Sequence, residues 1–492
     1  MGTRSIAALI LLLAFSFGCS NAGRLDRPNV VLLIIDDLGW ADIGAYGSEF
    51  HETPNIDRLA ASGALFTQFY AASPVCSPTR ASIMTGKHPA RLHLTDWIGG
   101  EQKGKLLPAD YVRELPLEEV TIGEAFKGAG YRTAFIGKWP LGSEPYHPEF
   151  QGFDVNIAGH GAGQPGSYFY PYTNERLPWS NVPDLETGEP SEYLTDRLTD
   201  EALSFITENR DRPFLLIVSH YAVHTPLEAK ANIVSDYQEK ARQLPDLEAP
   251  RFKAEGLAAN TKMRQDHPVY AAMVQSTDES VGRIMRKLEE LAIDRKTIVV
   301  FVSDNGGLST LSGRRTDMPT ANLPLRAGKG WLYEGGIRVP LLVAWRGAVE
   351  PGTVVTEPAM STDLYPTLLE MAGLERDPDH QPDGISLVPL LEQSGLLDRR
   401  SLFWHFPHYH GSGNVPSGAV RYGDYKLVEW FDGSRLELYD LARDIGESRN
   451  LITERAEVTR QLSVLLRRWR AEVDAWMPVP NPEWDTPNRG RK

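Results

Sequence analysis

The stretch of residues 73–81 brings together residue types that can bind or attack an anion. Pro78 is favoured in the first turn of a helix, and Gly86 is favoured directly after the last turn. Cys76 is therefore expected just before a helix N-terminus, where free backbone N–H groups and a positive partial charge favour an anion. Arg80 follows about one turn later and adds a planar cation. Cys76 is either a small buried apolar residue or a thiol nucleophile activated at the helix end.

Two pairs of oxygen-bearing side chains directly follow segments that are apolar without alternation. The pairs and their segments are Asp36-Asp37 after residues 29–35 and Asp304-Asn305 after residues 297–303. Such segments are typical of central strands in a parallel sheet, and ligands bind beyond the carboxyl ends of those strands. Oxygen ligands without Cys or His favour Ca²⁺ or Mg²⁺. Each pair alone could simply form a turn, but the two pairs together predict a metal site.

The elements that must position these residues alternate along the chain. Strands are expected at residues 29–35, 131–137, 213–219, 297–303 and 340–345, and helices at residues 53–63, 76–86, 121–130, 191–209, 268–291 and 363–372. This alternation predicts an α/β fold with a mostly parallel sheet and helices on both faces. After about residue 384, short strands predict a smaller antiparallel sheet, closed by an amphipathic helix over residues 458–476. Residues 144–190 are expected as loops over a site, and residues 228–267 as an irregular surface insertion.

Length, charge and the N-terminal segment indicate how many domains to expect, which partners to exclude and where the protein is located. The 492 residues suggest two or three domains, or one large α/β domain with an appendix. A net charge of −14 argues against non-specific binding to nucleic acid, although a local cationic pocket can still hold an anion. Residues 6–17 are apolar and too few to span a membrane, which predicts a signal peptide over residues 1–23 and export to the periplasm or cell surface. Cys19 lies in a sequence that resembles a relaxed lipoprotein cleavage site, so a lipid anchor is a further expectation. Removal or lipidation of Cys19 would leave Cys76 without a disulfide partner.

The segment Cys76-Ser77-Pro78-Thr79-Arg80 matches the signature Cys-x-Pro-x-Arg, and the chain resembles the formylglycine-dependent sulfatases over nearly its whole length. The segments that carry the resemblance are residues 28–39, 53–60, 76–86, 303–307, 325–340 and 438–451. The resemblance implies an alkaline-phosphatase-like fold. It also implies a catalytic domain over residues 24–384, a C-terminal subdomain over residues 385–480 and a tail over residues 481–492.

The same resemblance implies roles for individual residues. A maturation enzyme would convert Cys76 to formylglycine, whose hydrate attacks the sulfate ester and later expels sulfate. One Ca²⁺ would be held by this residue together with the ligands Asp36, Asp37, Asp304 and Asn305. Arg80, Lys138 and Lys329 would surround the formylglycine and the sulfate. His224 and Lys329 would protonate the leaving oxygen. A lone lysine is usually a solvated surface charge, but Lys138 after a strand and Lys329 in a glycine-flanked loop are better candidates than average. His220 competes with His224 for its role.

One position departs from the family pattern. Relatives usually read Gly-Lys-Trp-His-Leu-Gly, whereas this chain has Pro140 in place of that histidine. In relatives the histidine holds a hydroxyl of the hydrate and takes its proton when sulfate leaves, and proline can do neither. His147 or His160, which are near in sequence, could substitute. Otherwise sulfate release would be slow, or the chain would be a catalytically impaired glycan-binding relative.

The expected substrate is a sulfated carbohydrate or an aryl sulfate. Candidate substrate residues are Trp97, His160, His405 and His408, with His410 and the aromatic residues 168–170 as further candidates for the pocket wall. The histidine-rich run 405–410 could instead hold a transition metal or form a plain surface loop. A phosphoester or phosphonate hydrolase on the same scaffold is the alternative activity.

Overall fold

β1 (Asn29–Ile35) lies in the middle of an eight-stranded sheet and is buried along its whole length. The computed structural model describes residues 27–246, 250–256, 259–399 and 401–484, so the predicted signal peptide, Cys19 and the end of the tail lie outside it. In spatial order the strands of the sheet are β13 (Thr353–Val355), β2 (Ala64–Phe66), β12 (Leu341–Ala344), β10 (Thr297–Ser303), β1, β7 (Phe214–Ser219), β5 (Arg132–Gly137) and β6 (Val155–Ile157). β1 is parallel to β10 and β7, whereas β12 is antiparallel to both of its neighbours. The predicted mixed, mostly parallel sheet is confirmed.

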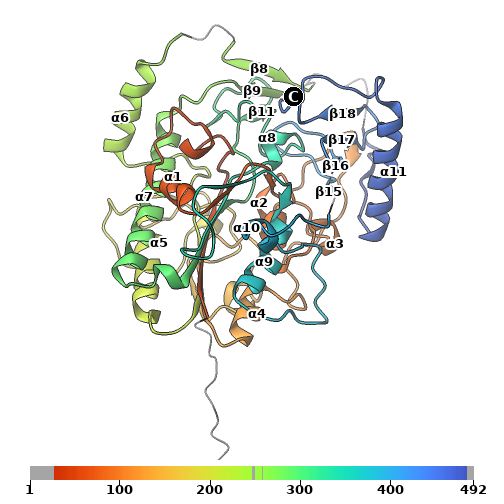
Figure 1. Ribbon diagram of the computed structural model, residues 1–492. Helices are drawn as coiled ribbons and strands as arrows, with labels where there is room; N and C mark the ends of the chain where they lie inside the picture. Colours follow the sequence, from red (N-terminus) through yellow and green to blue (C-terminus); the bar gives the residue numbers. More distant parts are fainter. Residues whose placement is uncertain (1–26, 247–249, 257–258, 400, 485–492) are drawn as a thin grey trace, which may run out of the picture.

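The unbroken apolar sequence of β1 is explained by burial of both faces of the sheet. Val30, Leu32 and Ile34 belong to one buried cluster, and the residues between them belong to another. Figure 1 shows the helices on the two sides. One cluster includes side chains of α2 (Cys76–Thr85), α4 (Ile122–Gly128), α9 (Leu364–Met371) and α10 (Val388–Leu391). The other includes side chains of α1 (Pro54–Ala61), α5 (Leu194–Asn209) and α7 (Pro268–Glu290). None of the described helices is long and apolar enough to cross a membrane.

The segment of residues 228–267 is more ordered than expected. It contains α6 (Ala231–Arg242) and a hairpin of β8 (Phe252–Glu255) and β9 (Ala259–Lys262), which is extended by β11 (Thr310–Ser312). Ile233 and Tyr237 of α6 pack against Ala271 and Ala272 of α7. The prediction of an irregular insertion was wrong, because so few apolar residues gave no clear periodicity in the sequence.

A second, smaller sheet follows the eight-stranded sheet in sequence and is antiparallel, as predicted. Its strands are β15 (Ser401–Phe406), β16 (Ser417–Tyr422), β17 (Tyr425–Trp430) and β18 (Leu436–Asp440). α11 (Ala456–Glu472), the blue helix in Figure 1, lies along this sheet. Its side chains Leu462 and Leu466 pack against Val420, Leu427 and Leu438 of the sheet. Shorter elements are β3 (Phe69–Tyr70), α3 (Pro89–Leu92), β4 (Leu106–Leu107), α8 (Glu334–Ile337), β14 (Ala359–Met360) and β19 (Val479–Pro480).

A buried ion network joins the small sheet to the larger part of the chain. Lys426 of β17 is fully buried, and its Nζ lies 2.9 Å from Glu334 Oε1 and 2.9 Å from Glu447 Oε1. The backbone N–H of Glu334 donates to Glu447 Oε2 at 2.7 Å, and Tyr70 donates its hydroxyl to Glu334 Oε2 at 2.8 Å. Because removing one partner would leave a buried charge unpaired, this network fixes α8 against the small sheet.

Candidate active site

Cys76 is the first residue of α2, one position further into the helix than predicted. Val75 before it is extended, and Gly86 ends the helix in the left-handed conformation with a φ of 70°. The side chain of Thr79 stabilises the turn before α2, because its hydroxyl donates to Ser73 O at 3.0 Å and accepts from Ser73 N at 3.2 Å. Cys76 is a free thiol with 4% exposure, and it lines a pocket.

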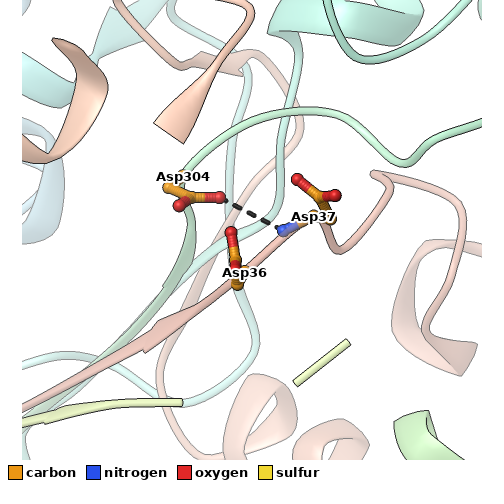
Figure 2. A group of neighbouring side chains, drawn as sticks. All are labelled: Asp36, Asp37 and Asp304. Carbon is orange, nitrogen blue, oxygen red and sulfur yellow. Dashed lines mark hydrogen bonds between the residues drawn. The ribbon is translucent and has the colours of Figure 1, made fainter. Parts of the chain in front are cut away.

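The two acidic pairs meet because β1 and β10 are parallel and in register, with Ile35 opposite Ser303. Asp36, Asp37 and Asp304 place carboxylate oxygens within 4.8 Å of one another (Figure 2). The N–H of Asp37 donates to Asp304 Oδ1 at 3.2 Å, which is the dashed line in Figure 2. Asn305 Nδ2 donates to Asp37 Oδ1 at 2.8 Å.

The oxygens of this cluster fit a hard cation. Asp36 Oδ1 and Asn305 Oδ1 are buried and have no hydrogen-bond partner among the described residues. Buried carboxylate and amide oxygens that lack donors are costly unless a cation satisfies them. An all-oxygen donor set favours Ca²⁺ or Mg²⁺ over a transition metal.

Three cationic side chains close around the acidic cluster. Arg80 Nε donates to Asp304 Oδ2 at 2.7 Å, and Lys329 Nζ lies 2.7 Å from Asp37 Oδ1. Lys138 follows β5 and donates from Nζ to Asp36 Oδ2 at 2.5 Å.

His224 completes this shell, because its Nε2 lies 3.7 Å from Asp37 Oδ2. Its Nδ1 lies 2.8 Å from the carbonyl oxygen of Thr225. Because a carbonyl can only accept, Nδ1 carries a proton in this arrangement. His220 lies elsewhere, with its Nε2 2.9 Å from Ser280 Oγ.

Burial and charge act against each other on the titratable groups of the site. Burial raises the pKa of Asp36 well above its ordinary value. Burial would also raise the pKa of Asp37, but Lys329 and His224 outweigh it and hold that pKa below its usual range. Burial lowers the pKa of His224 to about 3, and Lys329 adds to this effect. Opposed shifts of this kind are typical of functional sites.

A cavity of about 270 Å³ opens above Cys76. Its lining residues are Cys76, Ser77, Trp97, Ile98, Pro140, Gly161, Ala162, Gly163, Gln164, Trp179, His224, Lys329 and His410. None of these described lining residues is acidic, whereas Lys329 brings a positive charge. The pocket can therefore receive an anion beside the thiol.

Some sequence-predicted substrate residues do not line this cavity. His405 is buried, with its Nε2 2.8 Å from Trp476 O. His408 is buried as well, with its Nε2 2.8 Å from Thr95 Oγ1. His160 is not among the described lining residues either, although the next residue, Gly161, is; its Nδ1 lies 3.1 Å from the hydroxyl of Tyr221. The aromatic residue Tyr168 is fully buried and does not form the pocket wall.

Other residues of the pocket carried little or no signal in the sequence. His410 lines the cavity, although the sequence gave no reason to prefer it to its neighbours His405 and His408. Trp179 and Gln164 also line it and were not predicted. Both lie in the segment of residues 144–190, for which the sequence predicted loops over a site without selecting a side chain.

The sulfatase family model matches residues 28–374, which include every residue of the acidic cluster, the three cations and Cys76. The chain belongs to the sulfatase family. It is a sulfuric ester hydrolase with an alkaline-phosphatase-like fold. A second family model, for the C-terminal part of N-sulphoglucosamine sulphohydrolase, matches residues 327–472 of the sulfatase.

Known relatives cover most of this sulfatase. N-acetylgalactosamine-6-sulfatase of Sus scrofa is 33% identical over 441 residues, which cover 86% of this chain and 75% of the relative. A protein named sulfatase from Formosa agariphila is 30% identical over 522 residues, covering 92% and 89% of the two chains. The crystal structure of Ps i-CgsB in complex with k-i-k-neocarrahexaose matches with a TM-score of 0.72 at 27% identity, covering 94% and 96%.

Proposed function

We propose that this sulfatase removes sulfate from a sulfated carbohydrate, using formylglycine made from Cys76 and one bound calcium ion. The observation that carries the proposal is convergence at one buried place. The acidic cluster, Arg80, Lys138, Lys329 and the thiol all meet there, at a cavity with no acidic residue among its described lining residues. That arrangement suits an anionic substrate whose reacting group develops further negative charge.

The proposed calcium ligands are Asp36, Asp37, Asp304, Asn305 and the modified Cys76. The orphaned oxygens Asp36 Oδ1 and Asn305 Oδ1 support this assignment. When bound, calcium would supply positive charge that neutralises a sulfate oxygen and orients the nucleophile. Asn305 Nδ2 and the N–H of Asp37 orient the acidic oxygens before any ion arrives.

Oxidation of Cys76 to formylglycine by a maturation enzyme would supply a hydrated aldehyde that attacks sulfur and can later expel sulfate. The chain places this residue at the N-terminal end of α2, where backbone N–H groups favour developing oxygen charge. Thr79 and Val75 fix the turn that presents it. A plain hydroxyl at this position would remain esterified, so the aldehyde explains turnover.

The surrounding cations would bind sulfate and assist departure of the sugar oxygen. Arg80 and Lys138 hold fixed positions, because each is buried and paired with a carboxylate. Lys329 and His224 both line the cavity. We assign protonation of the leaving oxygen to Lys329, because His224 holds its proton on Nδ1 against Thr225 O and presents Nε2 as an acceptor, contrary to the donor role expected from the sequence. Both also contact Asp37, which keeps their nitrogens at one side of the pocket.

Pro140 lines the cavity where relatives carry histidine. Neither of the two substitutes considered from the sequence is among the described lining residues: His160 contacts Tyr221, and His147 lies near Glu149. His224 and His410 are the histidines within the described lining. We propose His224 as the substitute proton acceptor, because its Nε2 carries no proton, whereas Nδ1 of His410 already accepts from Ser412 N. The impaired glycan-binding protein is kept as an outcome of the test below.

The sulfated carbohydrate is proposed from the names of similar proteins together with the anion-receptive cavity. One relative is named N-acetylgalactosamine-6-sulfatase, and one structural neighbour holds k-i-k-neocarrahexaose. The predicted signal peptide and the Cys19 site support export to the periplasm or cell surface, with a lipid anchor at Cys19.

The decisive experiment compares matured protein with a Cys76→Ala variant. Co-expression with a formylglycine-generating enzyme should change the mass of the peptide that contains Cys76 from thiol to aldehyde. The matured protein should turn over 4-nitrophenyl sulfate many times and act far more slowly on 4-nitrophenyl phosphate, whereas Cys76→Ala should fold and be inactive. Faster cleavage of the phosphate ester would favour the alternative hydrolase. Binding of sulfated sugar without turnover would favour the impaired relative, and full activity of Cys76→Ala would refute the mechanism.

A further inference from the structure

Two tryptophans from distant parts of the chain line the cavity. Trp97 follows α3 and is half-buried, whereas Trp179 lies in a short 3-10 turn (Pro178–Ser180) and is 57% exposed. Burying this exposed aromatic surface on a ligand would be favourable. Trp179 therefore lies at the open rim of the same cavity that contains Cys76.

Neither indole has a hydrogen-bonding, aromatic or cationic partner among the described residues. Among the described residues, the side chains of Trp97 and Trp179 form no hydrogen bond through the indole nitrogen and contact no other aromatic ring or cation. Gln164, on the same loop segment as Trp179, also has no partner for its side-chain amide among the described residues. The cavity thus offers apolar ring faces together with free hydrogen-bonding groups.

The exposure of Trp179 is built into its turn. Ser180 is buried, and its hydroxyl donates to Leu177 O at 2.7 Å. Asn174 N donates to Asn181 Oδ1 at 2.7 Å, which links the chain before the turn to the residue directly after it. These bonds hold the backbone on both sides of Trp179, so its ring remains outside the protein interior.

The backbone turn that follows Trp97 in sequence lies against its indole ring. Gly99 has a φ of 111°, and a Cβ there would lie 3.0 Å from Trp97 Cζ3. The absence of that side chain lets the backbone of the turn lie against the indole. Trp97 is thus a half-buried side chain in the wall of the cavity, whereas Trp179 is an exposed side chain at its rim.

Cavity size separates what the two rings can contact. A volume of about 270 Å³ is at the low end of small-molecule pockets, which begin near roughly 300 Å³. The cavity therefore has room for about one sulfated ring beside Cys76 and Lys329. A further sugar of the same chain would leave the cavity at the rim, where Trp179 is exposed.

We propose that Trp179 is a stacking subsite for the sugar ring adjacent to the sulfated one. The inference rests on the proposed function, because it takes a sulfated oligosaccharide as the substrate. A sugar ring has an apolar C–H face bounded by hydroxyls, which matches an indole face next to a free amide such as that of Gln164. Trp179 thereby makes the enzyme selective for oligosaccharides over monosaccharides and simple aryl sulfates.

The test uses matched substrates of different length. Matured protein is first assayed on 4-nitrophenyl sulfate. It is then assayed on two pairs, each of a sulfated monosaccharide and a tetrasaccharide. The first pair is 6-O-sulfated N-acetylgalactosamine and a chondroitin 6-sulfate tetrasaccharide, and the second pair comes from carrageenan. Trp179→Ala should lower kcat/KM on the tetrasaccharide that is cleaved by about 3- to 10-fold, through KM, the size expected for one lost ring contact. Monosaccharide and aryl sulfate values should change less than about twofold, and Trp179→Phe should restore the tetrasaccharide value. Trp484→Ala, at an exposed tryptophan outside the described cavity lining, is the matched control.

The outcomes separate this inference from the proposed function. Equal losses on all substrates, or no loss on the tetrasaccharide, would overturn the subsite while leaving sulfate hydrolysis intact. Should the matured protein cleave none of the substrates, the proposed function fails, and tetrasaccharide binding is then followed by tryptophan fluorescence. Binding that weakens in Trp179→Ala but not in Trp484→Ala would still support the subsite. Absence of binding, or equal binding by all variants, would overturn it.

Discussion

Gly330 lies directly against His410, so that a Cβ on Gly330 would be 2.5 Å from His410 Nδ1. Gly330 has a φ of 84°, its N–H donates to Pro74 O at 2.8 Å, and it follows Lys329 in sequence. Three parts of the site therefore meet at this glycine: the loop of Lys329, the entry to α2 and the pocket histidine of the small sheet. The close approach leaves no room for a side chain.

Gly330→Ala should lower kcat/KM by roughly 100-fold, because displacing Lys329 and His410 by about 1 Å disturbs groups that contact the substrate. The matched control is Gly433→Ala, which has a φ of 70° and no atom within 4 Å of its added Cβ. Both substitutions place alanine in the left-handed region and should cost about 1 kcal/mol of stability. Aryl sulfate kinetics and thermal unfolding measure the two effects. Similar activity in both variants would show that backbone strain alone, rather than the contact with His410, matters at Gly330.

Calcium should stabilise the folded protein through the acidic cluster. A ligand that binds only the native state adds about 2.7 kcal/mol at 100 times its Kd, so Tm should fall after chelation and recover with added Ca²⁺. Asp304→Asn should lose most of this calcium-dependent shift. Asp278→Asn is the control, since Asp278 is buried elsewhere and caps α1 by accepting from Asn55 N and Ile56 N at 2.8 Å. A calcium response that is unchanged in Asp304→Asn would contradict the assigned site.

Stability should fall in mild acid partly because of His88. Burial lowers the pKa of His88 to about 4 from its ordinary 6.5. Its Nδ1 accepts from Ala90 N at 3.1 Å and its Nε2 lies 3.0 Å from Phe403 O, so a second proton would break the first bond. The unfolded chain binds this proton more readily, so the contribution is present above pH 6.5 and is lost as pH falls toward 4. The loss from this group is at most roughly 3 kcal/mol. Urea unfolding at pH 7 and pH 4.5 should show a smaller pH effect in His88→Gln, and equal effects would refute the assignment.

Pro140→His should raise kcat if release of sulfate lacks a proton acceptor. His410 Nδ1 accepts from Ser412 N at 3.2 Å, which leaves the proton on Nε2. His224 carries a proton on Nδ1, so its Nε2 is the free imidazole acceptor within the described lining. Burst kinetics with 4-nitrophenyl sulfate separate attack from release, and the variant should speed the slow phase alone. An unchanged slow phase would indicate that His224 already serves as the acceptor.

Much of the fold could be predicted because its signals are local. The segment of β1 is apolar throughout since both of its faces are buried, and Asp36 and Asp304 follow strands that lie side by side. Thr121 and Glu124 form a capping box at the start of α4, a pairing whose spacing of three residues can be seen in the sequence. The reversed direction of β12 left no such trace, because an antiparallel strand with both faces buried has the same apolar sequence as a parallel one.

The pocket wall was harder to predict because long-range contacts decide it. Trp404 of β15 donates its indole N–H to Ala71 O, so the next residue, His405, lies on the opposite face of the strand. His410 reaches the pocket only because its loop folds against Gly330, which is far away in sequence. Trp179 is placed by hydrogen bonds within an irregular turn. None of these arrangements has a periodicity that a single sequence could reveal.

The buried network of Lys426, Glu334 and Glu447 bears on how the chain can be divided. A fragment that stops near residue 384 would retain Cys76, the acidic cluster and all three cations, yet it would lack Lys426 and Glu447. Glu334, only five positions beyond Lys329, would then lose Lys426 and Glu447 as partners and retain Arg338 and Tyr70, and the segment that carries Lys329 would lose its contact with the small sheet. Trimming near residue 384 should therefore disturb the loop of Lys329, and gene fusions should join this protein at its C-terminal end.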